Sequence, residues 1–148
     1  MKRYPVQFDF VAQDLQTKGV WEQRTTDFIK THLKPGQIFL DVAAHIGYYS
    51  LIASDLGAKV VAFEPCQETG DIFLENTKDR TGISLFRLAL SNVRKESGNL
   101  FHGRTPGENS LVGSGESEPV RIVRFDEIFS FVPDFAKIDV EGCEREVL

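Results

Sequence analysis

The chain is poor in cysteine, with only Cys66 and Cys143 among its 148 residues. The two form neither a CxxC pair nor a Cys/His spacing, so the sequence indicates no disulfide framework and no cysteine-based metal centre. Free cysteine behaves as a small apolar residue, and we therefore expect both to be reduced thiols packed into the protein.

Long apolar runs and clusters of basic residues are also lacking. The first ten residues interleave Lys2, Arg3, Gln7 and Asp9 with apolar positions, so they contain no signal-peptide core and no membrane-spanning segment. We therefore expect a cytoplasmic protein with no membrane partner. The net charge of -5 and the lack of a Lys/Arg cluster argue against nucleic acid as a partner. One Trp beside twelve Phe indicates core packing rather than a base-stacking surface.

Short apolar runs alternate with segments of helical periodicity over most of the chain. Buried strands are predicted at Ile38–Val42, Val60–Phe63, Ser84–Leu88 and Phe135–Ile138. Helices are predicted at Glu22–Leu33, Tyr48–Leu56, Glu68–Lys78 and, as a short one, Asp126–Phe131. This alternation is typical of βαβ units, so the predicted fold class is α/β with a doubly wound, mostly parallel sheet.

The segment Gly103–Pro119 carries four glycines and two prolines and predicts an exposed loop rather than a domain boundary. The extended stretches beside it, Asn99–His102 and Val120–Arg124, are expected to pair as a hairpin. We therefore expect a helical lead-in over residues 1–35, followed by a single domain over residues 36–148.

A polar residue closes each of the four predicted strands, either at its end or shortly after it: Asp41, Glu64, Ser91 and Asp139. Ligands of doubly wound sheets bind beyond the carboxyl ends of the strands, near the point where the strand order reverses. Four polar residues at four strand ends therefore predict a ligand site at this edge of the sheet.

The loop after the first strand, Asp41–Gly47, lacks the glycine triplet of dinucleotide-binding loops. It places the carboxylate of Asp41 where such a loop would approach a diphosphate, which favours a cationic ligand. The alternative is that Asp41 only caps the next helix. Glu64 lies one strand–helix–strand unit later, where an acidic residue accepts hydrogen bonds from both ribose hydroxyls of a nucleoside.

Seven motifs occur in an order and spacing that resemble the FkbM-type S-adenosylmethionine-dependent methyltransferases. They are Leu33–Gly36, Ile46–Ser50, Ala62–Pro65, Leu88–Ser91, Asn109–Leu111, Phe125–Ile128 and Lys137–Gly142. The resemblance spans most of the chain beyond Trp21. It implies a Rossmann-like class I methyltransferase fold that binds S-adenosylmethionine and methylates an oxygen, often a hydroxyl group of a sugar or polyketide. The implied partner is a small-molecule or glycan acceptor.

The resemblance also implies roles for individual residues. Asp41 and the loop through Ala43, His45 and Gly47 would hold the methionine end of the cofactor, and Glu64 would hold the ribose. The segment Ala89, Leu90 and Ser91 would flank the adenine. Asp139 and Glu141 would lie beside the transferred methyl group.

Two residues depart from the family pattern within the first loop. Ala43 stands where the family has Gly, and His45 stands where it has Asn. If Ala43 has a positive φ, its Cβ strains the backbone. We expect the neutral His45 side chain to form the hydrogen bonds that Asn forms in the family. The alternative is that His45 accepts a proton near the sulfur of the methyl donor.

The third departure is length, because the family continues through further strands beyond position 148. We therefore expect a sheet that is incomplete at its C-terminal side, in which the strand ending at Asp139 has an open edge. Such an edge favours self-association or a partner chain.

Methyl transfer needs an aligned nucleophile and a base for the hydroxyl proton. We expect Asp139 or Glu141 to act as the base or to orient it, with His45 behind them and with Lys137 in a structural role. No residue pattern indicates a metal, although carboxylates at this strand end leave Mg²⁺ assistance open. Two alternatives remain: a non-catalytic or fragmentary domain that keeps the fold, and, ranked lower, an NAD-dependent oxidoreductase domain.

Overall fold

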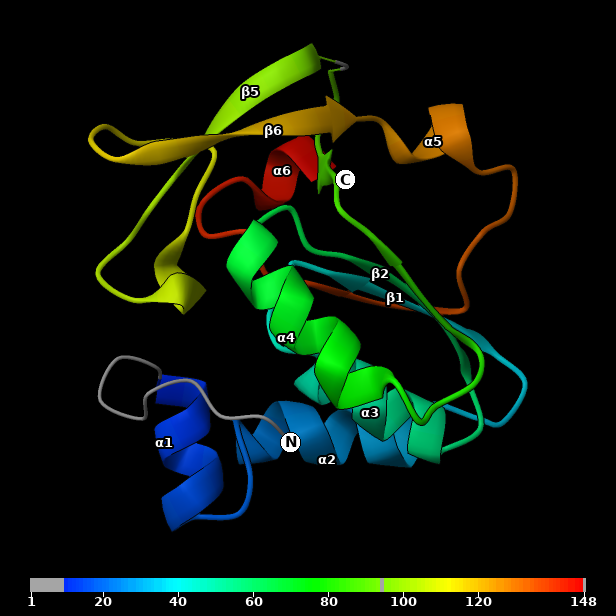
Figure 1. The fold of residues 1–148 in the computed structure, drawn as a ribbon. Coiled ribbons are helices and arrows are strands. Elements are labelled where there is room, and N and C mark those ends of the chain that lie inside the picture. The colour runs from blue at the N-terminus through cyan, green and yellow to red at the C-terminus, as the bar shows by residue number, and fades with distance from the viewer. Residues whose placement is uncertain (1–9, 94, 148) are drawn as a thin grey trace.

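Four parallel strands form the sheet that carries the predicted site (Figure 1). The computed structural model describes residues 10–93 and 95–147, so residues 1–9 of the expected lead-in lie outside the described part. The strands are β1 (Ile38–Val42), β2 (Lys59–Phe63), β3 (Ile83–Phe86) and β7 (Phe135–Ile138). Their order is β3-β2-β1-β7, and every neighbouring pair is parallel. The predicted α/β fold class is thus confirmed.

The strand order reverses at β1. The chain proceeds outward from β1 through β2 to β3 and later returns to the other side of β1 as β7. The carboxyl ends of β1 and β7 therefore flank the point at which open α/β sheets bind their ligands. Within the described residues β7 is an outer strand of this sheet, and self-association through it stays a prediction.

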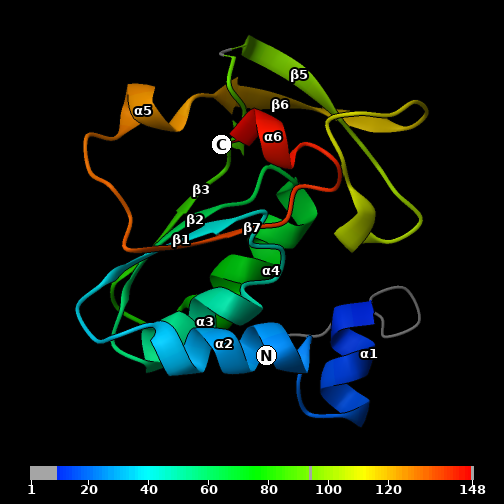
Figure 2. The ribbon, with the colours of Figure 1, turned by 180° about the vertical axis from the view of Figure 1, so that it is seen from behind.

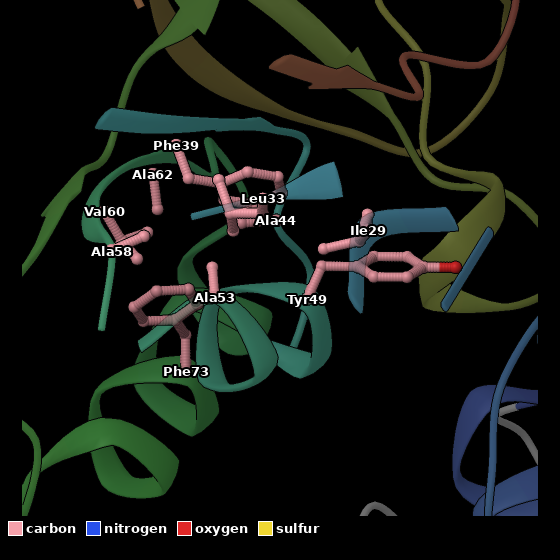
Figure 3. Close-up of a cluster of buried hydrophobic side chains, with 10 residues drawn as sticks. All are labelled: Ile29, Leu33, Phe39, Ala44, Tyr49, Ala53, Ala58, Val60, Ala62 and Phe73. Carbon is pink, nitrogen blue, oxygen red and sulfur yellow. The ribbon is translucent and has the colours of Figure 1, made fainter. Parts of the chain in front are cut away.

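Helices α2 (Gln23–His32), α3 (Tyr48–Asp55) and α4 (Gln67–Thr77) form a layer on one face of the sheet (Figure 1). Their buried side chains meet those of β1 and β2 in one core, drawn in Figure 3; the largest include Ile29, Phe39, Val60 and Phe73. Gly57 ends the α3 segment with a φ of 82°, a conformation that glycine adopts without steric cost. A further helix, α1 (Phe10–Thr17), precedes this layer.

The second sheet contains β4 (Ala89–Leu90), β5 (Lys95–Phe101) and β6 (Ser117–Val123), in the order β4-β6-β5. The pairing of β5 with β6 is antiparallel, so the predicted hairpin is present, but both strands begin earlier than predicted: Asn99 pairs with Pro119, and Val120 pairs with Gly98. The predicted third strand, Ser84–Leu88, extends too far, because β3 ends at Phe86 and the chain leaves the first sheet there. Ala89 and Leu90 then pair with Ile122 and Val123 in the second sheet.

The opposite face of the first sheet packs against aromatic side chains. On this side Figure 2 shows the short helices α5 and α6 rather than long ones. Phe63 stacks on Phe86 with ring centroids 5.4 Å apart and lies 6.2 Å from the ring of Phe129. The predicted helix Asp126–Phe131 is only the single turn α5 (Phe125–Ile128). It is shorter because Phe129 is extended, with φ -132° and ψ 141°, and its side chain joins this cluster. The last element is another single turn, α6 (Glu144–Val147).

Two smaller predictions concern the loop and the cysteines. The segment Gly103–Pro119 is largely exposed as predicted, but it contains the 3-10 turn η2 (Pro106–Glu108), and its last residues belong to β6. Cys66 and Cys143 are free and buried, as expected. Among the described helices none is long and apolar enough to cross a membrane.

Candidate active site

Parallel pairing brings the residues that follow β1, β2 and β7 to one edge of the sheet. Val42 lies beside Phe63 of β2 on one side and beside Ile138 of β7 on the other. The next residues along these strands, Ala43, Glu64 and Asp139, therefore emerge together.

A cavity of about 190 Å³ opens at this edge. Five of the predicted site residues line it: Ala43, His45, Glu64, Asp139 and Glu141. Four carboxylates face the cavity, because Glu22 lines it as well, whereas Lys137 is its only basic lining residue in the described part of the chain. The cavity is therefore rich in negative charge and suits a ligand that carries positive charge.

A smaller, mainly apolar cavity of about 40 Å³ adjoins the first. Its walls include Phe63, Leu88, Ala89, Leu90 and Val140, so Ala89 and Leu90, two of the three residues predicted to flank adenine, line this cavity. Both cavities share Ala43, Pro65, Leu100 and Asn109 as lining residues. They are thus two parts of one cleft, one polar and one apolar.

Ser91, Asp41 and Gly47 line neither cavity. The backbone N–H of Ser91 donates to the carbonyl of Val123 at 3.0 Å, in line with the pairing of β4 and β6. Gly47 begins helix α3, with φ 87°, and a Cβ at this position would lie 2.9 Å from the Phe73 ring. Asp41 and Gly47 are buried and therefore lie behind the wall of the cleft, whereas Ser91 is partly exposed.

Asp41 is fully buried and accepts a hydrogen bond from the Ser50 hydroxyl at 2.7 Å. The cap of helix α3 is Gly47, and Asp41 contacts this helix through the Ser50 side chain. Burial raises the pKa of Asp41, while the ammonium of Lys137, 3.9 Å from Oδ1, partly offsets the effect. Oδ1 accepts no hydrogen bond from any residue that the structure describes.

The loop after β1 has a strained backbone. Ala43 has φ 58° and His45 has φ 52°, which is the left-handed region that residues with a Cβ seldom adopt. The Gly-to-Ala departure noted in the sequence therefore places a Cβ where it costs free energy. The loop is held by hydrogen bonds from Ala44 N to the Phe63 carbonyl (2.9 Å) and from Asn76 Nδ2 to the Ile46 carbonyl (2.8 Å).

Glu64 joins the loops that follow β1 and β2. Its Oε2 accepts the backbone N–H of His45 at 2.8 Å, and its Oε1 accepts Cys66 N–H at 3.0 Å and the Thr69 hydroxyl at 2.9 Å. Burial raises the pKa of Glu64, and these three donors oppose the shift by stabilising the charged form. Because a carboxylate oxygen accepts two hydrogen bonds, Oε2 can accept one more from a ligand.

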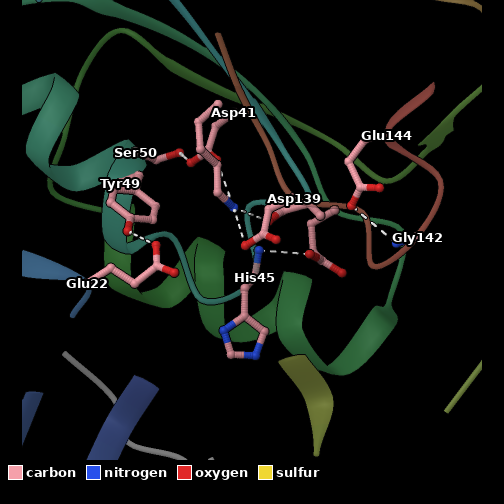
Figure 4. A network of polar contacts seen from close by, with 11 residues as sticks. Glu22, Asp41, His45, Tyr49, Ser50, Asp139, Gly142 and Glu144 are labelled. Atoms are coloured by element: carbon pink, nitrogen blue, oxygen red, sulfur yellow. Dashed lines mark hydrogen bonds and ion pairs between the residues drawn. The ribbon is translucent and has the colours of Figure 1, made fainter. Parts of the chain in front are cut away.

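His45 lines the cavity and binds Glu64 through its backbone. Figure 4 shows its imidazole ring pointing away from Asp139, whereas its backbone N–H is bound to Glu64. The geometry supports a role for the His45 backbone in shaping the loop.

Lys137 is a site residue whose place the sequence interpretation missed. Its ammonium donates to the Ala43 carbonyl at 3.1 Å and lies 3.5 Å from Asp139 Oδ2. It also lies 5.4 Å from the centre of the Tyr49 ring. The signal was available, because residues two apart on a strand share a face, so Lys137 and Asp139 point the same way.

The lead-in supplies a second group of residues that the sequence did not predict. Val11, Trp21 and Glu22 line the polar cavity, and the Tyr49 hydroxyl donates to Glu22 Oε2 at 2.5 Å (Figure 4). No local pattern could have revealed this contact, because it joins residues 27 positions apart through tertiary packing.

Glu141 is held at the mouth of the cleft. Its backbone has φ 48°, and its carbonyl accepts a hydrogen bond from the Ser110 hydroxyl at 2.9 Å. Partial burial, followed by repulsion from Asp139, raises the pKa of Glu141. The Asn109–Leu111 motif thus contacts the Lys137–Gly142 motif, and Asn109 lines both cavities. Within residues 10–93 and 95–147 no three acidic, His or Cys side chains are arranged to hold a metal ion.

Comparisons with solved structures identify methyltransferases of low similarity. A SAM-dependent methyltransferase from Agrobacterium tumefaciens is 18% identical over 47% of this chain and 25% of its own, with a TM-score of 0.42. The phosphoethanolamine N-methyltransferase 1 of Haemonchus contortus is 18% identical over 51% of this chain and 15% of its own (TM-score 0.41). The precorrin-6y C5,15-methyltransferase of Geobacter metallireducens is 18% identical over 57% and 48% (TM-score 0.40). This chain thus spans less than half of each of these proteins.

No curated protein matches the sequence. The sequence profile described as the methyltransferase FkbM domain matches residues 41–148, which begin at the buried Asp41 and include the strand-end residues Glu64, Asp139 and Glu141. This match covers well over half of the chain, and the chain therefore belongs to the FkbM methyltransferase family.

Proposed function

We propose that this protein binds S-adenosylmethionine in the two joined cavities and transfers its methyl group to a hydroxyl oxygen of a small-molecule or glycan acceptor. The observation that carries the proposal is the cleft at the point where the strand order reverses. One part of that cleft is lined by carboxylates and the other by apolar side chains.

The chemistry of the cleft fits the two ends of this cofactor. The loop Ala43–Gly47 and Glu64 would hold the methionine and ribose portions, with the free acceptor site of Glu64 Oε2 available to a ribose hydroxyl. Phe63, Ala89 and Leu90 would surround the adenine. When bound, the cofactor supplies an electrophilic methyl group on a positively charged sulfur.

The residues of the chain would align the acceptor and remove its proton. Glu141 is the better candidate for the base, because its raised pKa brings the carboxylate closer to the basicity that proton transfer near neutral pH requires. Asp139 is engaged by Lys137 at 3.5 Å and would orient the acceptor hydroxyl. No step in this proposal uses a metal ion.

Calorimetric titration with S-adenosylmethionine, with NAD as the control ligand, tests the first half of the proposal. Micromolar binding of S-adenosylmethionine alone supports it, and binding of NAD would favour the oxidoreductase alternative. Binding of neither ligand by a chain shown to be folded would overturn it. The test of transfer is formation of S-adenosylhomocysteine with a panel of hydroxylated acceptors; cofactor binding without any product would favour a non-catalytic domain.

A further inference from the structure

The lead-in forms a wall of the cleft that the family domain does not include. Trp21 and Glu22 line the polar cavity but lie ahead of residue 41, where the family match begins. The wall is joined to helix α3 through its two tyrosines. Tyr48 Oη accepts the Trp21 N–H at 3.3 Å, and Tyr49 Oη donates to Glu22 Oε2 at 2.5 Å. The same helix begins directly after the Ala43–Gly47 loop, so the wall and the loop share one support.

The backbone of Glu22 is unusual, with φ 41° and ψ 69° in the left-handed region. This conformation is unfavourable for a residue with a Cβ, and such strain tends to occur at functional sites. In this protein the strained residue is Glu22, whose side chain lines the cavity. Burial and the neighbouring Glu22 carboxylate raise the pKa of Tyr49, so its hydroxyl stays protonated and remains a donor. The Tyr49 bond occupies Oε2 and leaves Glu22 Oε1 for another donor.

Glu22 has no cationic partner among the described ion pairs. Lys137 is engaged elsewhere, by the Ala43 carbonyl at 3.1 Å and by Asp139 at 3.5 Å. The Glu22 carboxylate therefore lines the cavity together with three aromatic residues, Trp21, Tyr48 and Tyr49, of which Tyr49 already has the Lys137 ammonium 5.4 Å from its ring centre. A cavity lined by a carboxylate and by aromatic rings suits an ammonium group, which forms charge-assisted hydrogen bonds with the carboxylate and cation–π contacts with a ring that no other cation engages.

We propose that Glu22 binds an ammonium group inside the cleft. This inference rests on the proposed function, because the ammonium group has two sources there: the methionine end of the cofactor, or an amine on the acceptor. In either case the residues before position 41 contribute directly to ligand recognition.

The test compares Glu22→Gln with Glu116→Gln. Gln at position 22 keeps an oxygen for the Tyr49 hydroxyl and removes only the charge. Glu116 is an exposed residue outside the cleft, so its variant makes the same change in net charge without touching the site. Calorimetry measures the binding of S-adenosylhomocysteine, which has an ammonium group, and of 5′-methylthioadenosine, which lacks the amino-acid end. Saturation-transfer NMR then measures the binding of glucosamine and of glucose to protein that is saturated with S-adenosylhomocysteine.

If the ammonium group belongs to the cofactor, the affinity of Glu22→Gln for S-adenosylhomocysteine is about tenfold lower than that of Glu116→Gln. The affinity of the two variants for 5′-methylthioadenosine is then the same. If it belongs to the acceptor, S-adenosylhomocysteine binding is unchanged and the glucosamine signal is lost. Identical behaviour of the two variants towards all four compounds overturns this inference alone. Failure of the wild-type chain to bind either adenosyl compound overturns the proposed function and this inference with it.

Discussion

The ammonium of Lys137 lies 3.1 Å from the carbonyl oxygen of Ala43, a residue whose φ is 58°. A lysine on β7 thus binds the strained loop that follows β1, across the point where the strand order reverses. Its contact with Asp139, at 3.5 Å, links the same ammonium to the opposite wall of the cleft. Lys137 therefore connects the loop expected to hold the cofactor with the carboxylate expected to face the acceptor.

Replacing Ala43 with Gly is expected to stabilise the protein. A left-handed conformation costs an L-residue about 1–2 kcal/mol, and the extra flexibility of Gly in the unfolded chain cancels about half of that gain. The expected increase in the free energy of unfolding, measured by urea denaturation, is about 0.5–1 kcal/mol. Ala44→Gly is the control, because Ala44 is buried without a positive φ, and this variant should be less stable. A destabilised Ala43→Gly protein would contradict the strain argument.

Replacing Lys137 with Met should be strongly destabilising near neutral pH. Met retains an apolar stem but leaves the fully buried carboxylate of Asp41 without its cation. Breaking a buried pair in this way costs about 3–5 kcal/mol. Lys59→Met, at an exposed lysine at the start of β2, should change the unfolding midpoint very little. The double variant Lys137→Met/Asp41→Asn should recover part of the loss, and no recovery would exclude Asp41 as the residue that needs Lys137.

Replacing Asp41 with Asn should change how stability depends on pH. The folded-state pKa of Asp41 is raised above its ordinary value of 3.8, so its contribution to stability is present below that value and is lost as the pH rises through the higher folded-state pKa. Asn keeps an oxygen for the Ser50 hydroxyl and cannot ionise. The stability of Asp41→Asn relative to wild type should therefore rise as the pH increases above 3.8, by about 1.4 kcal/mol per unit of pKa elevation.

Asp126→Asn provides a control of opposite sign for that experiment. Its hydrogen bond with Arg124 lowers the pKa of Asp126, so removing the carboxylate should reduce stability slightly as the pH rises through the carboxyl range. Urea denaturation at several pH values measures both variants. If the free energy of unfolding changed with pH in the same way for wild type and Asp41→Asn, the buried carboxylate of Asp41 would not be a source of the pH dependence of stability.

Replacing Ser110 with Ala should loosen the mouth of the cleft. The Ser110 hydroxyl donates to the Glu141 carbonyl and accepts the Val112 N–H at 3.2 Å, and the loss of these bonds should cost about 1 kcal/mol locally. Hydrogen–deuterium exchange should become faster in residues 107–112 and 139–143 and should stay unchanged in β1 and β2. Ser114→Ala, at an exposed position in the same loop, should leave the exchange pattern as it is. Equal exchange in the two variants would exclude a role for the Ser110–Glu141 bond.

The sequence by itself determined most of the alternation of helices and strands and pointed to the strand ends as the place for a ligand. Hydrophobic periodicity is a local property, so Ile38–Val42 and Phe135–Ile138 could be recognised as strands without any knowledge of their neighbours. Glu64 and Asp139 could be predicted for a similar reason, because each follows an apolar run directly and parallel strands end at one edge of the sheet, whereas Glu141 was expected only from the resemblance to the family.

Tertiary structure alone decided which distant residues complete the cleft. Leu90 belongs to the second sheet because its backbone pairs with Val123. This pairing determines where β3 ends, and no feature of the Ala89–Leu90 sequence indicates it. Lys137 and Glu22 gained their roles through contacts with Ala43 and Tyr49, which lie 94 and 27 positions away in the chain. The physical reason is that local patterns determine which side of an element is buried, whereas packing of one element on another determines which side chains meet.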